Sequence, residues 1–360
     1  MATAVIYDLL VPLRALGSIA FSPFVPGALL VGATYAPDTL RNATASVLKK
    51  LPEQLSALLL RAAPDDSSTA MTVLKVVVAL GAISKANSTL STMAHNSWRL
   101  GPAKGWDWPK EIAVVTGGAS GIGKDTTLKL VALSVRVAVL DIQDLPKDMQ
   151  GNANIRFYRC DVTSADAVAA VAAVAAVADA IRSDLGHPSI LINNAGVAQP
   201  RPILKTDPKF LHTIFSFLPA MIEQNKGYVV TVASIASFVA LATAADYSAT
   251  KAGALAFHET LACELKHHYK APNVLTTVVH PNFVRTPLIQ ALTARLERGS
   301  VRLLTSDEVA EVIISQVKSR RGAQVVIQSA ASILAGFRAW PSWLQEFVRD
   351  IVGKGTARRR

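Results

Sequence analysis

Seven short runs of apolar, largely β-branched residues, spaced along residues 109–330, constrain the fold of this chain more than any other feature. Each run lies between segments of helical length. Continuous apolar runs of this kind are typical of parallel strands buried on both faces, and their alternation with helices predicts a doubly wound α/β sheet of the Rossmann type. The predicted strands are Ile112–Val115, Val135–Leu140, Ile155–Tyr158, Ile190–Ile192, Val229–Val232, Val274–Val279 and Val325–Ile327.

A glycine-rich segment, Thr116–Gly123, follows the first predicted strand directly and begins a helix. Glycines at this place permit a tight turn and let the backbone approach a pyrophosphate closely, while the N-terminus of the helix supplies N–H donors and the positive end of its dipole. The segment predicts a dinucleotide site. Its cofactor-binding candidates are Gly117, Ser120, Gly121, Ile122 and Gly123.

An aspartate ends the second predicted strand. Asp141 lies 18 residues after Gly123. A carboxylate there accepts hydrogen bonds from the ribose hydroxyls of an adenosine and repels a 2′-phosphate, which favours NAD over NADP. Two features leave NADP open: Asp141 could instead cap the next helix, and Lys124 beside the glycines softens the preference.

Three polar residues further along the chain form a candidate proton-transfer site. Tyr247 and Lys251 are four residues apart, so both lie on one face of a helix. A nearby ammonium lowers the pKa of a phenol, and the phenol can then exchange a proton with an alcohol or a carbonyl. Ser234 lies at the end of the fifth predicted strand, where its hydroxyl can bind the same substrate oxygen. These three are the catalytic candidates.

Taken together, these motifs resemble the short-chain dehydrogenase/reductase family. They occur in the family's order, cover about 220 residues and as a set are very specific. The matching segments are Thr116–Gly123, Cys160–Val162, Asn193–Gly196, Ser234, Tyr247 with Lys251, and His280–Thr286.

The resemblance implies roles for further residues. Asp161 and Val162 would contact adenine, Asn193 and Gly196 would line the cofactor cleft, and Tyr247 and Lys251 would also face the cofactor. Thr286 would bind the nicotinamide carboxamide, and Pro287–Leu304 would form a mobile lid over the substrate. Thr305–Glu308 has the spacing of a capping box that begins the next helix.

The segments Phe217–Met221 and Val230–Ser234 are similar to the membrane-associated retinoid and hydroxysteroid dehydrogenase branch of the family. That likeness implies an NAD(P)-dependent oxidoreductase that interconverts a lipophilic alcohol and its carbonyl. It also implies an attachment to the endoplasmic reticulum or to lipid droplets, with the catalytic domain in the cytosol. A homodimer stays open as a further partner.

One departure from the family pattern concerns the crossover before the fifth strand. Family members carry there an asparagine that completes a catalytic tetrad, whereas no asparagine lies between Gly196 and Asn225 in this chain. About a dozen residues are missing near Phe215, or ~18 Å of helix. The crossover is still long enough for the fold, but the gap leaves a second function open: a catalytically impaired, membrane-bound pseudoenzyme or scaffold.

The sequence predicts three regions. They are an apolar, helical, membrane-associating N-terminal extension (1–108), the sheet domain (109–330) and a C-terminal tail (331–360). Ala15–Pro37 is uncharged and long enough to span a bilayer, but Pro23 and Pro26 favour a bent or interfacial segment. A second apolar stretch, Met71–Ser84, is expected to be too short to span alone. The alternative is a pair of helices packed on the main domain. The aromatic and basic C-terminal tail, 331–360, predicts an amphipathic segment.

Composition excludes several classes of protein. The net charge is +11 and the hydrophobic fraction 51%, but the basic residues are scattered and no nucleic-acid motif occurs, so nucleic acid is not an expected partner. The two cysteines, Cys160 and Cys263, are too few for a disulfide framework or a cysteine-rich zinc site. We therefore expect free thiols and no structural metal.

Overall fold

The computed structural model describes residues 24–35, 67–161, 167–195, 211–240, 244–290, 293, 296–297 and 302–357. The chain divides into two compact units, residues 4–92 and residues 93–360. The domain boundaries expected from the sequence stay a prediction.

The N-terminal unit contains two apolar helices, α2 (Phe24–Tyr35) and α5 (Ser67–His95). The expectation that Met71–Ser84 is too short to span alone is wrong as a statement about the helix, because α5 continues to His95. The hydroxyls of Thr89 and Thr92 donate to carbonyls four residues earlier at 2.9 Å, which hides polar groups within the helix. Met71–His95 is long and apolar enough to cross a membrane by length and composition.

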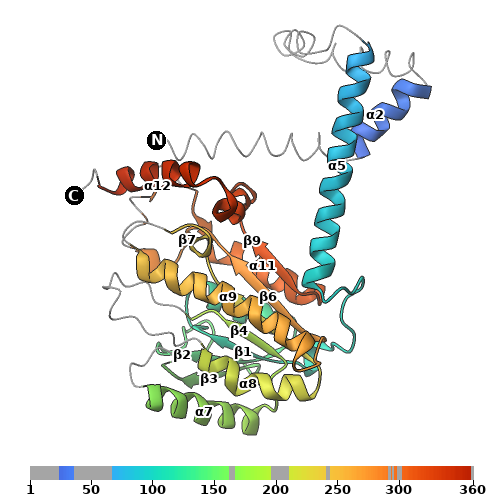
Figure 1. Cartoon of the computed structure of the whole chain (residues 1–360). Coiled ribbons are helices and arrows are strands. Elements are labelled where there is room, and N and C mark those ends of the chain that lie inside the picture. The colour runs from blue at the N-terminus through green and yellow to red at the C-terminus, as the bar shows by residue number, and fades with distance from the viewer. Residues whose placement is uncertain are drawn as a thin grey trace. The chain divides into compact units, whose positions relative to one another are not determined.

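All seven predicted strands are confirmed as one parallel sheet in the order β3-β2-β1-β4-β5-β6-β9 (Figure 1). The strand order reverses at β1, whose neighbours are β2 on one side and β4 on the other. The fold predicted from the sequence is therefore confirmed. The strands are β1 (Ile112–Thr116), β2 (Arg136–Asp141), β3 (Ile155–Arg159), β4 (Ile190–Asn193), β5 (Gly227–Val232), β6 (Val274–His280) and β9 (Ala323–Val326).

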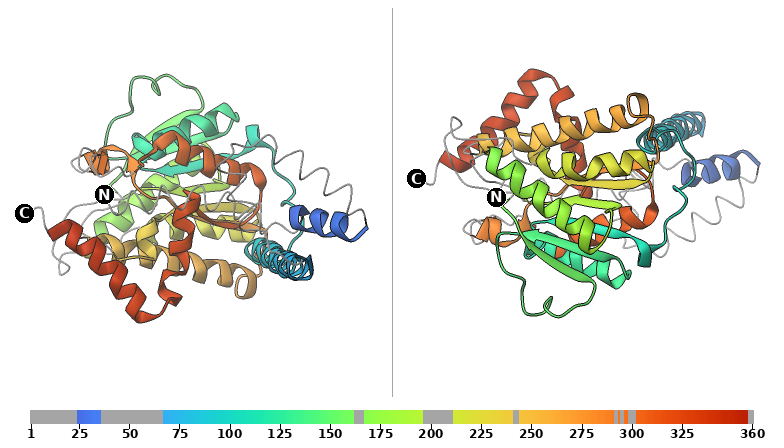
Figure 2. Two further views of the ribbon diagram at one scale, coloured as in Figure 1. Left: turned by 90° about the horizontal axis from the view of Figure 1, so that it is seen from above. Right: turned by 90° about the horizontal axis from the view of Figure 1, so that it is seen from below.

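Helices cover both faces of this sheet because successive strand residues point to opposite sides. Val115 packs in a core with α6 (Gly121–Ala132) and α11 (Ser306–Ser319). Its neighbour Val114 packs in a second core with three other helices, which lie side by side in Figure 2. Those helices are α7 (Ala167–Asp184), α8 (Leu211–Glu223) and α9 (Ala245–His267).

The crossover before β5 still forms a helix, although the sequence indicates that about a dozen residues are missing there. α8 has 13 residues and contains Pro219. Phe217, Leu218 and Met221 are buried in the second core, where they cover the sheet. The described part of the crossover therefore still supplies a packed helix, although it carries no asparagine within Leu211–Glu223.

Two small features frame the expected lid. β7 (Val284–Arg285) and β8 (Leu304–Thr305) pair in parallel and fix the ends of the segment between them, of which 291–292, 294–295 and 298–301 lie outside the described residues. The short 3₁₀ helix η4 (Pro287–Ile289) follows Thr286. The capping box is confirmed: the Thr305 side chain accepts from the Glu308 N–H at 3.1 Å, and the Glu308 carboxylate accepts from the Thr305 N–H at 2.8 Å.

The C-terminal residues pack on the sheet unit. Two helices follow β9, the 3₁₀ helix η5 (Ser329–Ala339) and the amphipathic α12 (Ser342–Ala357). Phe337 is fully buried in a third core cluster with Ile235 and Phe238, which belong to the turn after β5. Within the expected amphipathic tail, Ser342–Ala357 therefore form a helix, with Trp343 and Phe347 exposed.

A buried carboxylate ties together the amino ends of the central strands. Glu111 follows the 3₁₀ helix η1 (Trp108–Lys110), and its side chain is 3% exposed. Lys226 Nζ lies 2.6 Å from its Oε1, the Ser189 hydroxyl donates to its Oε2, and the Asp107 N–H donates to it at 3.1 Å. A buried charge with this many donors stabilises the fold only while its counter-charge is present.

Replacing Lys226 with methionine is expected to destabilise the protein. The change leaves Glu111 buried without a counter-charge, so we expect the free energy of unfolding to fall by about 2–4 kcal/mol in urea denaturation. The double variant Glu111→Gln/Lys226→Met should recover part of this loss. Equal stability of Lys226→Met and wild type would contradict the assigned role of the ion pair.

Candidate active site

The described candidate residues lie at the carboxyl edge of the parallel sheet, because each follows or ends a strand or begins the helix after it. The glycine segment follows β1, Asp141 ends β2, Asp161 follows β3 and Asn193 ends β4. Ligands of open α/β sheets bind at this edge where the strand order reverses. Val162 and Gly196 lie outside the described residues, so their expected contacts stay predictions.

The glycine positions of this segment are packed so closely that a side chain on them would meet neighbouring atoms. A Cβ on Gly123 would lie 2.0 Å from the Gly117 carbonyl oxygen, and Gly117 has a φ of +63°. The Ser120 side chain, at the N-cap of α6, makes no capping hydrogen bond. The first turn of α6 therefore presents backbone N–H groups beside a bare backbone turn, which fits a pyrophosphate.

The structure brings Gly121 against Thr286, the residue that follows β7. A Cβ on Gly121 would lie 3.2 Å from Thr286 Cγ2, so the predicted nicotinamide contact sits beside the predicted pyrophosphate turn. Ile122 and Gly123 form the first turn of α6 with Gly121.

Sequence reasoning missed a residue that holds the glycine segment. The Asn194 side-chain amide donates to the Thr116 carbonyl at 3.1 Å and to the Gly117 carbonyl at 3.2 Å. The Thr116 hydroxyl accepts from the N–H groups of Asn194 and Ala195 at 3.1 and 3.0 Å. The position of Asn194, one residue past β4 and beside β1, is the sequence signal that could have found it.

Asp141 is buried, with 7% of its surface exposed, and its carboxylate faces the glycine segment. It accepts from the Ala119 N–H at 2.9 Å and from the Gln143 N–H at 3.0 Å. Lys124 is paired with Asp148 at 2.6 Å, so its charge is balanced by a neighbour.

Ser234 and Tyr247 are brought together where β5 ends and α9 begins. The Ser234 hydroxyl accepts from the Ala236 N–H at 3.2 Å, which caps the 3₁₀ helix η3 (Ile235–Ser237). Burial raises the pKa of Tyr247, and a hydrogen bond with the Ser234 side chain lowers it. The residue that lowers the pKa of this phenol is therefore Ser234.

Lys251 lies one helical turn after Tyr247 and donates to the Val232 carbonyl at 2.8 Å, with its Nζ 5.8 Å from the centre of the Tyr247 ring. Burial lowers the pKa of Lys251 to about 8. An unfolded chain keeps this proton up to the ordinary pKa of 10.5. The buried ammonium therefore costs stability below pH 8, and that cost is relieved as the pH rises from 8 toward 10.5.

His280 packs behind Ser234 and contacts its backbone. It is fully buried, as expected for a histidine at a strand end, and its Nδ1 lies 3.1 Å from the Ser234 carbonyl oxygen. The Phe238 ring lies 4.5 Å from the His280 ring. Burial lowers the pKa of His280 to about 4, so the ring is neutral at physiological pH and acts as packing and a hydrogen-bond partner.

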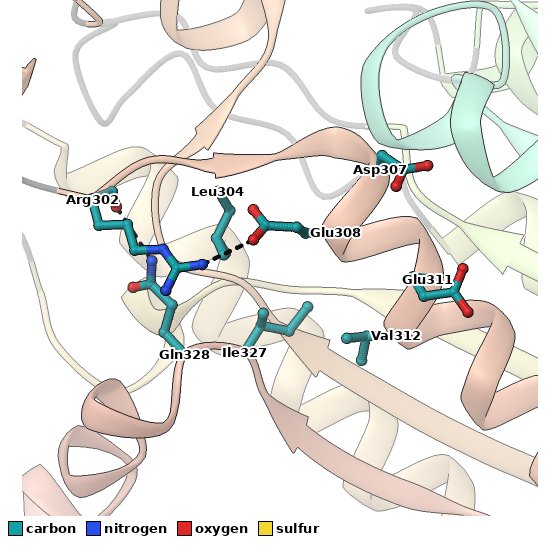
Figure 3. Close-up of a pocket in the computed structure, with 8 residues that line it drawn as sticks. All are labelled: Arg302, Leu304, Asp307, Glu308, Glu311, Val312, Ile327 and Gln328. Carbon is teal, nitrogen blue, oxygen red and sulfur yellow. Dashed lines mark hydrogen bonds and ion pairs between the residues drawn. The ribbon is translucent and has the colours of Figure 1, made fainter. Parts of the chain in front are cut away.

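A separate pocket of about 410 Å³ opens beside the start of α11 and the end of β9 (Figure 3). Its charges are paired within the protein: Arg302 lies 2.9 Å from Glu308, and Lys129 lies 2.9 Å from both Asp307 and Glu311. None of the predicted site residues lines it. The lining residues are Arg302, Leu304, Asp307, Glu308, Glu311, Val312, Ile327 and Gln328.

Comparison with protein families agrees with this geometry. The family model described as short chain dehydrogenase matches residues 111–297, more than half of the chain. The chain belongs to the short-chain dehydrogenase family. The family resemblance and the expectation of an enzyme of this family are therefore confirmed, and the matched range contains the glycine segment and the candidates Ser234, Tyr247 and Lys251.

Named relatives and solved structures are similar to parts of the chain. Dehydrogenase RED2 of Cochliobolus heterostrophus is 35% identical over 56% of this chain and 78% of its own length. Epidermal retinol dehydrogenase 2 of Mus musculus is 29% identical over 51% of this chain and 64% of its own length. A short chain dehydrogenase/reductase from Burkholderia phymatum, solved in complex with NAD, has a TM-score of 0.54 at 21% identity, covering 67% of this chain and 97% of its own, which shows the shared fold.

Two glycine substitutions test the backbone cradle. Gly123→Ala drives a Cβ into the Gly117 carbonyl, so we expect binding of NADH, followed by its fluorescence, to be lost. Gly253→Ala is the matched control, because its Cβ meets nothing within 4 Å in α9, and we expect unchanged binding with a gain of about 0.5–1 kcal/mol in stability. Unchanged NADH binding by a folded Gly123→Ala variant would contradict the assignment.

Proposed function

We propose that this chain is an NAD(P)-dependent oxidoreductase that interconverts a lipophilic alcohol and its carbonyl compound. The grouping of Ser234, Tyr247 and Lys251 at the same carboxyl edge of the sheet as a turn of closely packed glycines is the observation that carries this proposal. The nicotinamide, when bound, supplies hydride transfer to and from the substrate carbon.

The chain's own residues would move the proton. Tyr247 would donate its hydroxyl proton to the carbonyl oxygen in reduction and accept it in oxidation, while the Ser234 hydroxyl would orient that oxygen. Lys251 would hold the nicotinamide ribose. Its pKa of about 8 means that its charge changes near physiological pH.

The position of the Asp141 carboxylate supports NAD as the cofactor. Its buried carboxylate lies at the end of β2, where it would accept from the adenosine ribose and repel a 2′-phosphate. Lys124 is already paired with Asp148, which weakens it as a phosphate ligand. Asn193, Gly196, Asp161, Val162 and Thr286 complete the proposed cofactor set.

The similarity to a retinol dehydrogenase supports a lipophilic alcohol of the retinoid, steroid or fatty alcohol type. Such a substrate resides in membranes, and α5 is apolar, 29 residues long and mostly exposed in the structure. We therefore infer attachment to the endoplasmic reticulum or to lipid droplets, with the catalytic unit in the cytosol. A homodimer stays a prediction.

A catalytically silent scaffold is the other function that the sequence leaves open. The described part of α8 carries no asparagine, which removes one member of the family's tetrad from Leu211–Glu223. The contact between Ser234 and Tyr247 nevertheless exists without it, and Lys251 keeps a defined hydrogen bond. These contacts favour an active enzyme.

Replacing the candidate acid–base residue tests the reaction. We expect Tyr247→Phe to lower kcat for retinoid, steroid or fatty alcohols about 10²–10⁴-fold, because the proton has no other carrier, and to leave the Kd for NADH within about twofold. Tyr269→Phe changes an exposed tyrosine and serves as the control. Cofactor binding without any turnover in the wild type would favour the scaffold instead.

A second test concerns the membrane. Val76, Leu80 and Ile83 lie along one exposed face of α5, with exposed fractions of 52%, 48% and 65%. We expect the full-length chain to float with phospholipid vesicles, and the triple variant Val76→Asp/Leu80→Asp/Ile83→Asp to float much less because charges do not partition into lipid. Full-length protein that remains soluble without detergent and does not float would contradict membrane attachment.

A further inference from the structure

The C-terminal segment contacts the turn that follows Ser234. Arg338, in η5, donates from Nε to the Phe238 carbonyl and from Nη2 to the Ser237 carbonyl, both at 3.2 Å. One planar guanidinium thus binds two successive carbonyl oxygens of the turn, about a hundred residues earlier in the chain. Such a fork fixes both the position and the orientation of the backbone that it binds.

A buried aromatic ring reinforces this contact. Phe337 is fully buried and packs with Ile235, Phe238 and Val239, which form and follow η3. Adjacent residues of η5 therefore hold the turn by packing and by hydrogen bonds. The segment that supplies them lies beyond the range matched by the family model.

The same turn connects to both Ser234 and Lys251. The Ser237 hydroxyl donates to the Lys251 carbonyl at 2.9 Å, which ties the turn to α9. Phe238 contacts His280, and His280 Nδ1 lies 3.1 Å from the Ser234 carbonyl oxygen. A shift of the turn would therefore move Ser234 and the backbone of Lys251 together.

We propose that Arg338 and Phe337 are positioning residues, and that the C-terminal segment clamps the Ser237–Phe238 turn to hold Ser234 and Lys251 in register with Tyr247. This inference rests on the proposed function. The hydrogen bonds of the Arg338 guanidinium go to the Phe238 and Ser237 carbonyls, so Arg338 acts on the catalytic candidates through the turn. Its side chain is exposed, so its removal leaves the apolar core in place.

Arg338→Ala tests the clamp. We expect kcat to fall about tenfold or more, because small displacements of positioned groups strongly reduce rates. The Kd for NADH should change less than kcat, because Lys251 is only one of the residues proposed to bind the cofactor. Arg338→Lys keeps the charge but loses the fork, so its kcat should lie between those of the wild type and the alanine variant. The control is Arg182→Ala, which also removes an arginine that donates to a backbone carbonyl, that of Ser216 at 3.2 Å.

Hydrogen–deuterium exchange of residues 235–239 tests the clamp without any substrate. We expect faster exchange there in Arg338→Ala and unchanged exchange in Arg182→Ala, because local opening is limited by the contacts that hold a segment. Unchanged exchange, or an equal loss of kcat in both variants, would overturn the proposal. If the wild type turns over no alcohol, the proposed function fails, while the exchange measurement still decides whether the clamp exists.

Discussion

Parallel pairing of β1 with β4 is the constraint on which the site depends. Ala113 to Val115 pair with Ile190 to Ile192, while the other edge of β1 pairs with β2. The chain leaves β1 toward β2 and leaves β4 toward β5, so the connections that follow these two neighbouring strands run in opposite directions and diverge. Thr116 and Asn194, one at the end of each strand, then bind one another and the glycine turn. The backbone cradle is thus a product of sheet topology.

The site carries an energetic cost that the rest of the fold offsets. Lys251 and Tyr247 are both buried enough for burial to dominate their pKa shifts, and His280 and His258 lie neutral with pKa values of about 4. Each of these groups loses hydration on folding. The two apolar cores on the faces of the sheet supply the compensating burial of apolar surface. The sheet can therefore hold buried polar groups at its carboxyl edge.

What the sequence predicts here depends on the range of the interactions. The strands and the Thr305 capping box are local patterns, so their residues alone identify them. The grouping of Ser234, Tyr247 and Lys251 follows from the ends of elements and from the family resemblance. The contact of Arg338 with Ser237 and Phe238 joins residues about a hundred positions apart without any local pattern, and no periodicity predicts it. The continuation of α5 to His95 is not evident from hydropathy, because Ser and Thr count as polar residues although the Thr89 and Thr92 hydroxyls bond within the helix.

The strand order also has a kinetic consequence. The β1–β4 and β1–β2 pairs share one central strand, yet Ala113 pairs with Val137 nearby in the chain and with Ile190 far along it. The loop that closes when β1 pairs with β4 is the longer one, so its closure costs more chain entropy before the contacts between the two strands form. Parallel strand pairs that join residues far apart in the chain form slowly, because the loop between them must close before they make contact. Substitutions in β4 are therefore expected to change the folding rate of this protein more than equally buried substitutions in β2, even where equilibrium stability changes alike.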